Sequence, residues 1–259
     1  MTLKSLARRL IDRSLARRGY SLARTSVGDT GWEEVVRRAC ASTPQGRPLV
    51  LDIGAHCGGF SESVLNRWPK AEVYAFEPIP ELLESIRALH RRYPGLTDVP
   101  LALGAETGEA EFNIHAHSDS SSLLAVDLPY ARLYPGQAAL ARRIQVKVRR
   151  LDDWAGEAGL SAGRHVDLVK MDVQGFEGRV IDGGQATLSR TRYLVTEAAL
   201  YPCYAGGIML DELCAKLRAL DFELIWGFNV FAASADLFWQ NRKLSQVPRK
   251  TATITKESL

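Results

Sequence analysis

One short segment of the chain combines glycines with an acidic residue at a turn. Residues 50–60 read VLDIGAHCGGF, so that Asp52 precedes a glycine-rich turn beginning at Gly54. Glycines suit such a turn because the backbone bends sharply and approaches a ligand closely. A pyrophosphate cofactor would favour glycine where Ala55 stands, and the carboxylate of Asp52 would repel its phosphates. The segment therefore predicts a cationic, phosphate-free ligand, a description that S-adenosylmethionine meets with its sulfonium and ammonium groups.

A second acidic residue follows the next apolar run. The apolar run Val73–Phe76 is followed directly by Glu77. Glu77 lies about 20 residues after Gly54, the distance expected for an acid that binds ribose hydroxyls. A third segment, residues 166–177, places Lys170 and Asp172 two positions apart, and hence on the same side of a strand. Asp172 would lie at the carboxyl edge of the sheet, where open α/β sheets bind their ligands.

Around these segments the apolar pattern alternates between strands and helices. Short apolar runs predict buried strands, and apolar residues at three- and four-residue spacing predict amphipathic helices. This alternation predicts an α/β fold with a doubly wound, mostly parallel sheet. The predicted strands are Pro48–Ile53, Ala71–Phe76, Leu96–Leu103, Val166–Asp172, Tyr193–Glu197, Phe222–Trp226 and Asp236–Trp239, and the predicted helices are Trp32–Ala41, Gly58–Trp68, Glu81–Arg92, Phe176–Gly183 and Leu210–Leu220.

The middle of the chain breaks this rhythm. Glu109–His115 and Arg143–Leu151 alternate apolar and polar residues, as half-exposed antiparallel strands do. Residues 117–137, between them, are rich in Ser, Asp, Tyr and Pro. We therefore predict an N-terminal helical extension over residues 1–44, a main domain over 45–240 and a polar tail over 241–259. The main domain would carry an inserted β-hairpin and lid at about 109–150.

Three of these segments together resemble the FkbM family of S-adenosylmethionine-dependent methyltransferases. They are LDIGAHCGGFS at residues 51–61, VYAFEPIP at 73–80 and LVKMDVQGFEGRVIDGG at 168–184, and the resemblance extends over roughly residues 48–240. It implies the seven-stranded, Rossmann-like sheet of class I methyltransferases, with the last strand antiparallel. It also implies transfer of a methyl group to a hydroxyl of a sugar, a glycan or a natural product such as a glycoside or macrolide. His56 and Gln174 stand where the family often has Asn and Glu.

The resemblance also assigns residues to the cofactor and the acceptor. Glu77 would bind the ribose hydroxyls, and Ser121 and Ser122 would lie near the mouth of the methyl-transfer zone. Tyr130, Tyr134 and Tyr201, in predicted loops, are the expected acceptor contacts because sugars stack on aromatic faces. The residues implied around the cofactor are Asp52, Gly54, Ala55, His56, Gly58, Phe60, Glu77, Pro78, Ile79, Ala102, Leu103 and Asp172.

Methylation of a hydroxyl requires a group that accepts its proton. Asp172 is the first candidate for this base and Glu197, at the end of another predicted strand, is the second. Asp172 has the alternative role of binding the amino group of the cofactor. Lys170 is a base only if burial lowers its pKa, and its alternative role is a structural ion pair. Asp172 and Glu197 with a further acid would alternatively form an oxygen site for Mg²⁺, which would lower the pKa of the acceptor hydroxyl.

Composition excludes several other classes of protein. The net charge of +3 conceals a basic N-terminus, because residues 1–24 carry seven basic side chains and one acidic one. The remainder is mildly acidic, which argues against nucleic-acid binding. The four cysteines form no C-x-x-C pair, so a zinc ribbon or redox motif has no support. No signal sequence or membrane-spanning run is evident, and a cytoplasmic location is expected.

Several alternatives stay open from the sequence. Leucines at helical spacing make residues 1–24 a basic amphipathic helix, which either packs on the body or contacts the inner face of a membrane. The acceptor would be a small molecule or a glycan, and neither its identity nor the oligomeric state follows from the sequence. A methyltransferase acting on nitrogen, a dinucleotide oxidoreductase and a non-catalytic binding module with this fold are the competing functions, the oxidoreductase being disfavoured by Asp52 and Ala55.

Overall fold

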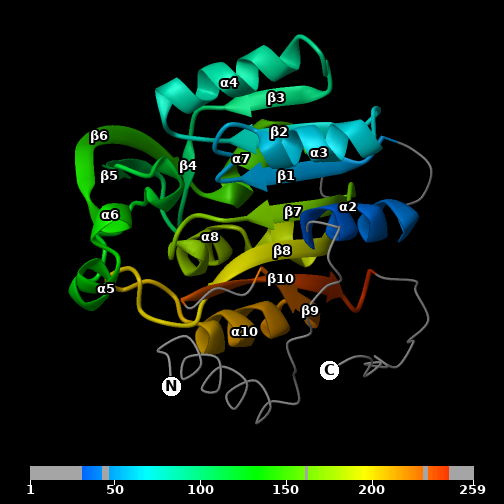
Figure 1. The fold of residues 1–259 in the computed structure, drawn as a ribbon. Coiled ribbons are helices and arrows are strands. Elements are labelled where there is room, and N and C mark those ends of the chain that lie inside the picture. Colours follow the sequence, from blue (N-terminus) through cyan, green and yellow to red (C-terminus); the bar gives the residue numbers. More distant parts are fainter. Residues whose placement is uncertain (1–30, 43–46, 161–162, 230–232, 245–259) are drawn as a thin grey trace, which may run out of the picture.

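The computed structural model describes residues 31–42, 47–160, 163–229 and 233–244. The predicted amphipathic helix within residues 1–24 lies outside these ranges. Within the described residues, a seven-stranded sheet has the order β3-β2-β1-β7-β8-β10-β9 (Figure 1). Six of its strands run in the same direction, and β10 runs antiparallel to its neighbours β8 and β9. Its strands are β1 (Leu49–Ile53), β2 (Glu72–Phe76), β3 (Leu96–Val99), β7 (Val166–Met171), β8 (Thr191–Ala199), β9 (Phe222–Phe228) and β10 (Ser234–Asn241).

Helices cover both faces of this sheet, as the doubly wound prediction requires. One face packs against α2 (Gly31–Ser42), α3 (Gly59–Arg67) and α4 (Pro80–His90). The other packs against α7 (Leu151–Glu157), α8 (Glu177–Gly183), α9 (Gln185–Ser189) and α10 (Leu210–Ala219). Val50 belongs to the first apolar cluster and Leu51 to the second, because successive strand residues point to opposite faces. All five residues of β1 are buried, as expected for a central parallel strand.

A second, three-stranded sheet has the order β4-β6-β5 and lies to one side of the main sheet in Figure 1, where β1, β3 and β7 end. The strands β5 (Gly108–His115) and β6 (Leu140–Arg149) form the antiparallel hairpin predicted for the middle of the chain. Between them lie the 3₁₀ turn η1 (Ser118–Ser120) and the short helices α5 (Leu128–Leu133) and α6 (Pro135–Ala138). We call residues 108–149 the insert. Its apolar face, which includes Phe112 and Val146, packs on Ile79 of the main domain.

Two predictions of secondary structure were wrong. The predicted strand Leu96–Leu103 is two strands in different sheets, because β3 ends at Val99 and β4 (Ala102–Leu103) pairs with β6. Pro100 lies between them and has no N–H to donate to a ladder, and Leu101 N–H turns back to donate to the carbonyl oxygen of Val99. The predicted strand Arg143–Leu151 ends at Arg149, and Leu151 begins helix α7, which the sequence analysis missed together with α9.

No helix among the described residues is long and apolar enough to cross a membrane.

Candidate active site

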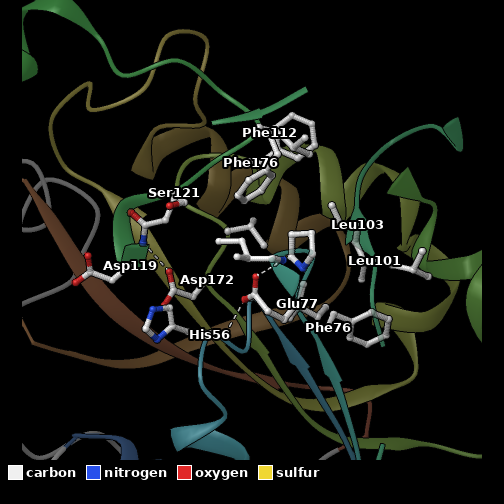
Figure 2. A pocket seen from close by; sticks show the side chains of 18 of the residues that line it. His56, Phe76, Glu77, Leu101, Leu103, Phe112, Asp119, Ser121, Asp172 and Phe176 are labelled. Atoms are coloured by element: carbon white, nitrogen blue, oxygen red, sulfur yellow. Dashed lines mark hydrogen bonds between the residues drawn. The ribbon is translucent and has the colours of Figure 1, made fainter. Parts of the chain in front are cut away.

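A pocket opens beside the carboxyl ends of β1, β2 and β7 and is walled on its other side by the insert (Figure 2). The empty space between its walls, which includes space open to solvent, is about 690 Å³. In Figure 2 the polar side chains of Asp119, Asp172 and His56 gather at one end, and Leu101 and Leu103 lie toward the other. The remaining lining residues are Ile53, Gly54, Phe76, Glu77, Pro78, Ile79, Ala102, Phe112, Ser118, Ser121, Leu123, Lys170, Val173, Gln174 and Phe176.

The loop after β1 is fixed by backbone hydrogen bonds to the neighbouring strand. The N–H groups of Gly54 and Ala55 both donate to the carbonyl oxygen of Phe76, at 3.1 and 2.9 Å. Gly54 has a φ of 75°, and a Cβ there would collide with the carbonyl oxygen of Asp172. Glycine is therefore required at this position for two independent reasons. His56 also has a positive φ, 52°, and its Nε2 lies 2.8 Å from Oγ of Ser118 in the insert.

Glu77, at the end of β2, has a buried carboxylate held in one orientation. Its Oε1 accepts a hydrogen bond from the N–H of Ile79 and its Oε2 accepts one from the N–H of His56, both at 2.9 Å. Burial raises the pKa of Glu77 to about 7, while these two backbone donors act in the opposite direction. The side chain lies between the polar and the apolar ends of the pocket, where two adjacent hydroxyl groups of a ligand would meet it.

A buried ion cluster lies below the polar end of the pocket. The ammonium group of Lys170 is 3.6 Å from Oδ1 of Asp52 and 3.4 Å from Oδ2 of Asp172, and it donates to the carbonyl oxygen of Gly54. Oδ2 of Asp52 accepts a hydrogen bond from Oγ of Ser61 at 2.6 Å. Two carboxylates thus face one ammonium group, which leaves the cluster with an excess of negative charge and favours a cationic ligand.

The environment of Lys170 does not suit a general base. Burial disfavours its charged form, but the carboxylates of Asp172 and Asp52 outweigh this effect, so that the pKa of Lys170 lies above its ordinary value. Lys170 could act as a base only if burial lowered its pKa, and this requirement is not met. Its contacts instead match the alternative role of a structural ion pair between β1 and β7.

The two candidate bases are joined by a single amide group. Nε2 of Gln174 donates hydrogen bonds to Oδ1 of Asp172 and to Oε2 of Glu197, each at 2.8 Å. Oε1 of the same side chain lies 2.8 Å from the hydroxyl of Tyr204. Burial, followed by repulsion from Asp172, raises the pKa of Glu197 to about 8. Glu197 can thus exchange a proton near neutral pH, which is the property required of a general base.

The site does not fit the predicted Mg²⁺. A magnesium ion takes oxygen ligands in near-octahedral geometry, and the facing oxygens of Asp172 and Glu197 are both occupied by the N–H groups of Gln174, which cannot bind a cation. No group of three or more His, Cys, Asp or Glu side chains within the described ranges is arranged to hold a metal ion. We therefore derive no step that involves a metal.

The structure brings most of the predicted cofactor residues together, but not all of them. Gly54, His56, Glu77 and the segment after β7 line the pocket, as do Pro78, Ala102, Leu103 and Ser121. Other predicted residues lie outside the lining. Asp52 and Ala55 are buried beneath it, Gly58 packs against Ile86 and Leu89 of α4, and the ring of Phe60 contacts Trp32.

The predicted acceptor residues occupy three different settings. Ser122 is buried, and its hydroxyl donates to the carbonyl oxygen of Gln174 at 2.8 Å. Tyr134 and Tyr201 are more than one-third exposed, and Tyr130 contacts Tyr134 with ring centroids 4.9 Å apart. Burial raises the pKa of Tyr130 to about 12, with smaller contributions from Cys203, Tyr134, Glu197 and Asp119. Tyr130 therefore lies within electrostatic reach of the polar end of the pocket.

Sequence reasoning missed several lining residues. Phe112 and Leu123 come from the insert, and Phe176 precedes α8. Phe112 lies at an apolar position of the predicted strand Glu109–His115. The alternation of apolar and polar residues in that strand does not indicate which part of the fold Phe112 contacts. Ser118 and Asp119 lie in η1, where no periodic pattern exists to place them. The connection of Gln174 to Tyr204 spans two loops and left no signal in the sequence.

The strand order, the antiparallel β10, the glycine loop after β1 and the acid at the end of β2 define a class I S-adenosylmethionine-dependent methyltransferase. Residues 52–224 match the methyltransferase FkbM domain, and the chain belongs to this family. The chain is 31% identical over 204 residues to the 2-O-methyltransferase NoeI of Sinorhizobium fredii, an alignment that covers 76% of this chain and 81% of NoeI.

Two further similarities accompany this match. The chain is 28% identical to the 31-O-demethyl-FK506 methyltransferase FkbM of Streptomyces tacrolimicus, over 79% of this chain and 81% of that protein. Among solved structures, the fibrillarin pre-rRNA processing protein of Methanococcus jannaschii aligns with a TM-score of 0.46 and 11% identity, over 83% of this chain and 80% of that one.

Proposed function

We propose that this methyltransferase transfers the methyl group of S-adenosylmethionine to a hydroxyl group of a sugar-containing acceptor, a glycan or a glycosylated natural product, and that Glu197 accepts the proton. The observation that carries the proposal is that Gln174, which lines the pocket together with Asp172, joins Asp172 to Glu197, a carboxylate directly behind the lining residues. The names of NoeI and FkbM, both of which specify methylation of oxygen, support the choice of a hydroxyl acceptor.

The donor side of the pocket consists of the loops that follow β1, β2 and β7. When bound, S-adenosylmethionine supplies a methyl group on a sulfonium ion, which is a good leaving group. Glu77 would hold its ribose, and the apolar end, with Leu101 and Leu103, would enclose its adenine. The negative excess at Asp52, Lys170 and Asp172 would stabilise its two positive charges. The residues present thus fit this cofactor.

The acceptor side consists of the central part of the insert, residues 115–138, and the loop after β8, residues 200–209. The two segments are joined by backbone hydrogen bonds, from the N–H of Asp127 to the carbonyl oxygen of Cys203 and from the N–H of Ala205 to that of Ala125. Exposed aromatic rings on this side, Tyr134 and Tyr201, support a sugar as part of the acceptor, since sugar rings stack on aromatic faces.

Glu197 is favoured over Asp172 as the base. The carboxylate of Asp172 is already paired with Lys170, and it lines the donor end of the pocket. Glu197 lacks a cation of its own among the groups that shift its pKa, and its value of about 8 makes it the stronger proton acceptor. In the reaction, the acceptor oxygen would form a bond to the methyl carbon as the bond from that carbon to sulfur breaks, which leaves S-adenosylhomocysteine, and the acceptor proton would pass to a carboxylate oxygen of Glu197.

The test is a screen for transfer of radiolabelled methyl from S-adenosylmethionine to glycan and glycoside extracts, with the wild type, Glu197→Gln and Asp172→Asn. We expect labelled methyl ethers, and kcat about 100-fold lower or more for Glu197→Gln, the typical contribution of a general base. Activity of the wild type should rise with pH up to about 8, the pKa of Glu197, and this rise should disappear in the Glu197→Gln variant.

Three outcomes would contradict parts of the proposal. Label found on nitrogen would change the acceptor class, and tight binding of NAD without binding of S-adenosylhomocysteine would change the cofactor. A Glu197→Gln variant with an unchanged pH profile would remove Glu197 as the base and leave Asp172. Each assay is repeated with EDTA, which should leave the rate unchanged because the site does not fit a divalent cation.

A further inference from the structure

Gln174 lies in a loop that is held in an unfavourable backbone conformation. Its φ is 54°, a value that residues other than glycine adopt rarely. The carbonyl oxygen of Gln174 accepts a hydrogen bond from Ser122, and Oε1 of Glu177 accepts hydrogen bonds from the N–H groups of Val173 and Gly175. A strained conformation that is fixed from both sides in this way often serves a function. Here it directs the amide of Gln174 between the two carboxylates.

The orientation of this amide is determined by its neighbours. The NH₂ group faces Asp172 and Glu197, since the opposite orientation would place the amide oxygen against the carboxylate of Asp172, which is paired with Lys170. Oε1 then faces Tyr204, whose hydroxyl lies 2.8 Å from this atom and 2.8 Å from the carbonyl oxygen of Ser120 in η1. The hydroxyl of Tyr204 is itself buried, and burial raises its pKa, so that it stays a proton donor at all physiological pH values.

We propose that Gln174 is a positioning residue for methyl transfer: its amide holds the carboxylates of Asp172 and Glu197 in one geometry, and Tyr204 fixes that amide and links it to the insert. This inference rests on the function proposed above and adds to it the group that aligns the base. A neutral amide here donates hydrogen bonds to two neighbouring carboxylates, whereas a cation would be needed to neutralise their charge.

Other charged groups also lie near Glu197 and shift its pKa. Glu177 lies at the start of α8, and Asp236 lies directly opposite Glu197 on β10. Ser234 donates a hydrogen bond that opposes the rise in the pKa of Glu197. Asp172 contributes the largest repulsion, and Lys170 reaches the cluster through its contact with Asp172. A change at Gln174 leaves all of these groups in place, and its effect can therefore be separated from theirs.

The first test is a titration that does not depend on an acceptor. In protein with ¹³C-labelled glutamate carboxylates, the NMR signal of Glu197 is assigned by its loss in Glu197→Gln and followed against pH. In Gln174→Met, which keeps the side-chain length and removes the donors, we expect the pKa of Glu197 to rise by about 1 unit, because a hydrogen bond to the charged form is lost. The exposed Gln185→Met serves as the matched control and should leave the signal unchanged.

The second test measures the reaction. We expect kcat to fall about 10- to 100-fold in Gln174→Met, as for loss of hydrogen bonds to charged groups, with the affinity for S-adenosylhomocysteine unchanged. Tyr204→Phe should lower kcat by a smaller factor of about 3–10, since the amide keeps its carboxylate partners. The control is Tyr93→Phe, which removes a hydroxyl that donates a hydrogen bond to Oδ1 of Asn66, outside the residues that line the pocket. Thermal unfolding of every variant shows whether it is folded.

The inference is overturned if Glu197 titrates identically in the wild type and in folded Gln174→Met, or if that variant keeps the kcat and pH profile of the wild type. Absence of methyl transfer to any hydroxyl by the wild type would contradict the proposed function instead. In that case the titration still decides whether Gln174 controls the state of Glu197.

Discussion

The donor side and the acceptor side of the pocket are held by different kinds of structure. On the donor side, short loops leave buried strands, and their backbone is bonded to the next strand, as in the contacts of Gly54 with Phe76 and of Asp172 with Ile53. On the proposed acceptor side, short helices and turns carry side chains such as Tyr134 and Tyr201, which lie outside the residues that line the pocket and remain more than one-third exposed. The difference teaches that one chain can fix the backbone of one wall of a site while it leaves side chains of the neighbouring surface exposed.

The largest effect is expected at Gly54. In Gly54→Ala, the new Cβ meets the carbonyl oxygen of Asp172, and the backbone must keep a positive φ. We expect affinity for S-adenosylhomocysteine to fall more than about 100-fold and the free energy of unfolding to fall by about 2 kcal/mol or more. Calorimetry and denaturant unfolding measure the two. Gly59→Ala, where a Cβ has open space at the start of α3, is the matched control, and equal losses in both variants would refute the distinction.

Glu77 gives the next effect on the donor side. Glu77→Gln removes the charge while preserving the size of the side chain, and we expect affinity for S-adenosylhomocysteine to fall about 10- to 100-fold, the value of hydrogen bonds to a charged acceptor. Isothermal titration calorimetry measures it. The control is Glu81→Gln, an exposed acid on α4 that forms a surface ion pair with Arg142. Unaltered affinity in Glu77→Gln would mean that the ribose lies elsewhere.

Two buried carboxyl groups near Glu197 make stability dependent on pH. Burial raises the pKa of Asp236 to about 7, and that of Glu177 likewise to about 7. The folded state then binds more protons than the unfolded state between about pH 4 and pH 7, so stability is greatest at the acidic end of this window and is lost as pH rises through 7. We expect Asp236→Asn to reduce this loss by about 2 kcal/mol.

Denaturant unfolding at pH 5.5 and pH 8.5 measures this dependence. Asp153→Asn, at an exposed ion pair on α7, is the control and should leave the difference between the two pH values as in the wild type. A wild type that is more stable at pH 8.5 than at pH 5.5 would contradict the assigned direction.

The smallest effect is expected on the acceptor side. Tyr134→Ala removes an exposed ring that contacts Tyr130, and we expect the KM for the acceptor to rise about 3- to 10-fold, the loss of one stacking contact. The affinity for S-adenosylhomocysteine should not change. Leu140→Ala, at another exposed position of the insert, is the control. If Tyr134→Ala instead weakened binding of S-adenosylhomocysteine, Tyr134 would not act on the acceptor alone.

The loops after β1 and β2 could be predicted from the sequence because their signals are local. A strand, a glycine turn and an acid at a strand end are all written within a few residues, and Gly54 and Glu77 occupy the expected places. The seven-stranded, mostly parallel sheet and its antiparallel last strand followed from the resemblance and are confirmed. The break at Pro100 was missed because an apolar run does not reveal which sheet each half joins.

The rest of the site depends on contacts between distant segments. Gln174, Tyr204 and Ser120 meet only after the insert and the loop after β8 have folded against each other. The spacing of these residues in the sequence does not predict their contacts. The role of Lys170 also required the structure, because its pKa depends on two carboxylates that come from different strands.

The backbone pairing of residues 125–127 with residues 203–205 has a consequence for engineering. Val126 and Tyr204 form a β-bridge, and the flanking hydrogen bonds reach Ala125 and Cys203. A chimera that exchanges substrate preference with a relative would therefore have to graft both stretches as one cassette. Transplanting either stretch alone would pair a foreign backbone edge with a native one and disturb the contact between the insert and the loop after β8.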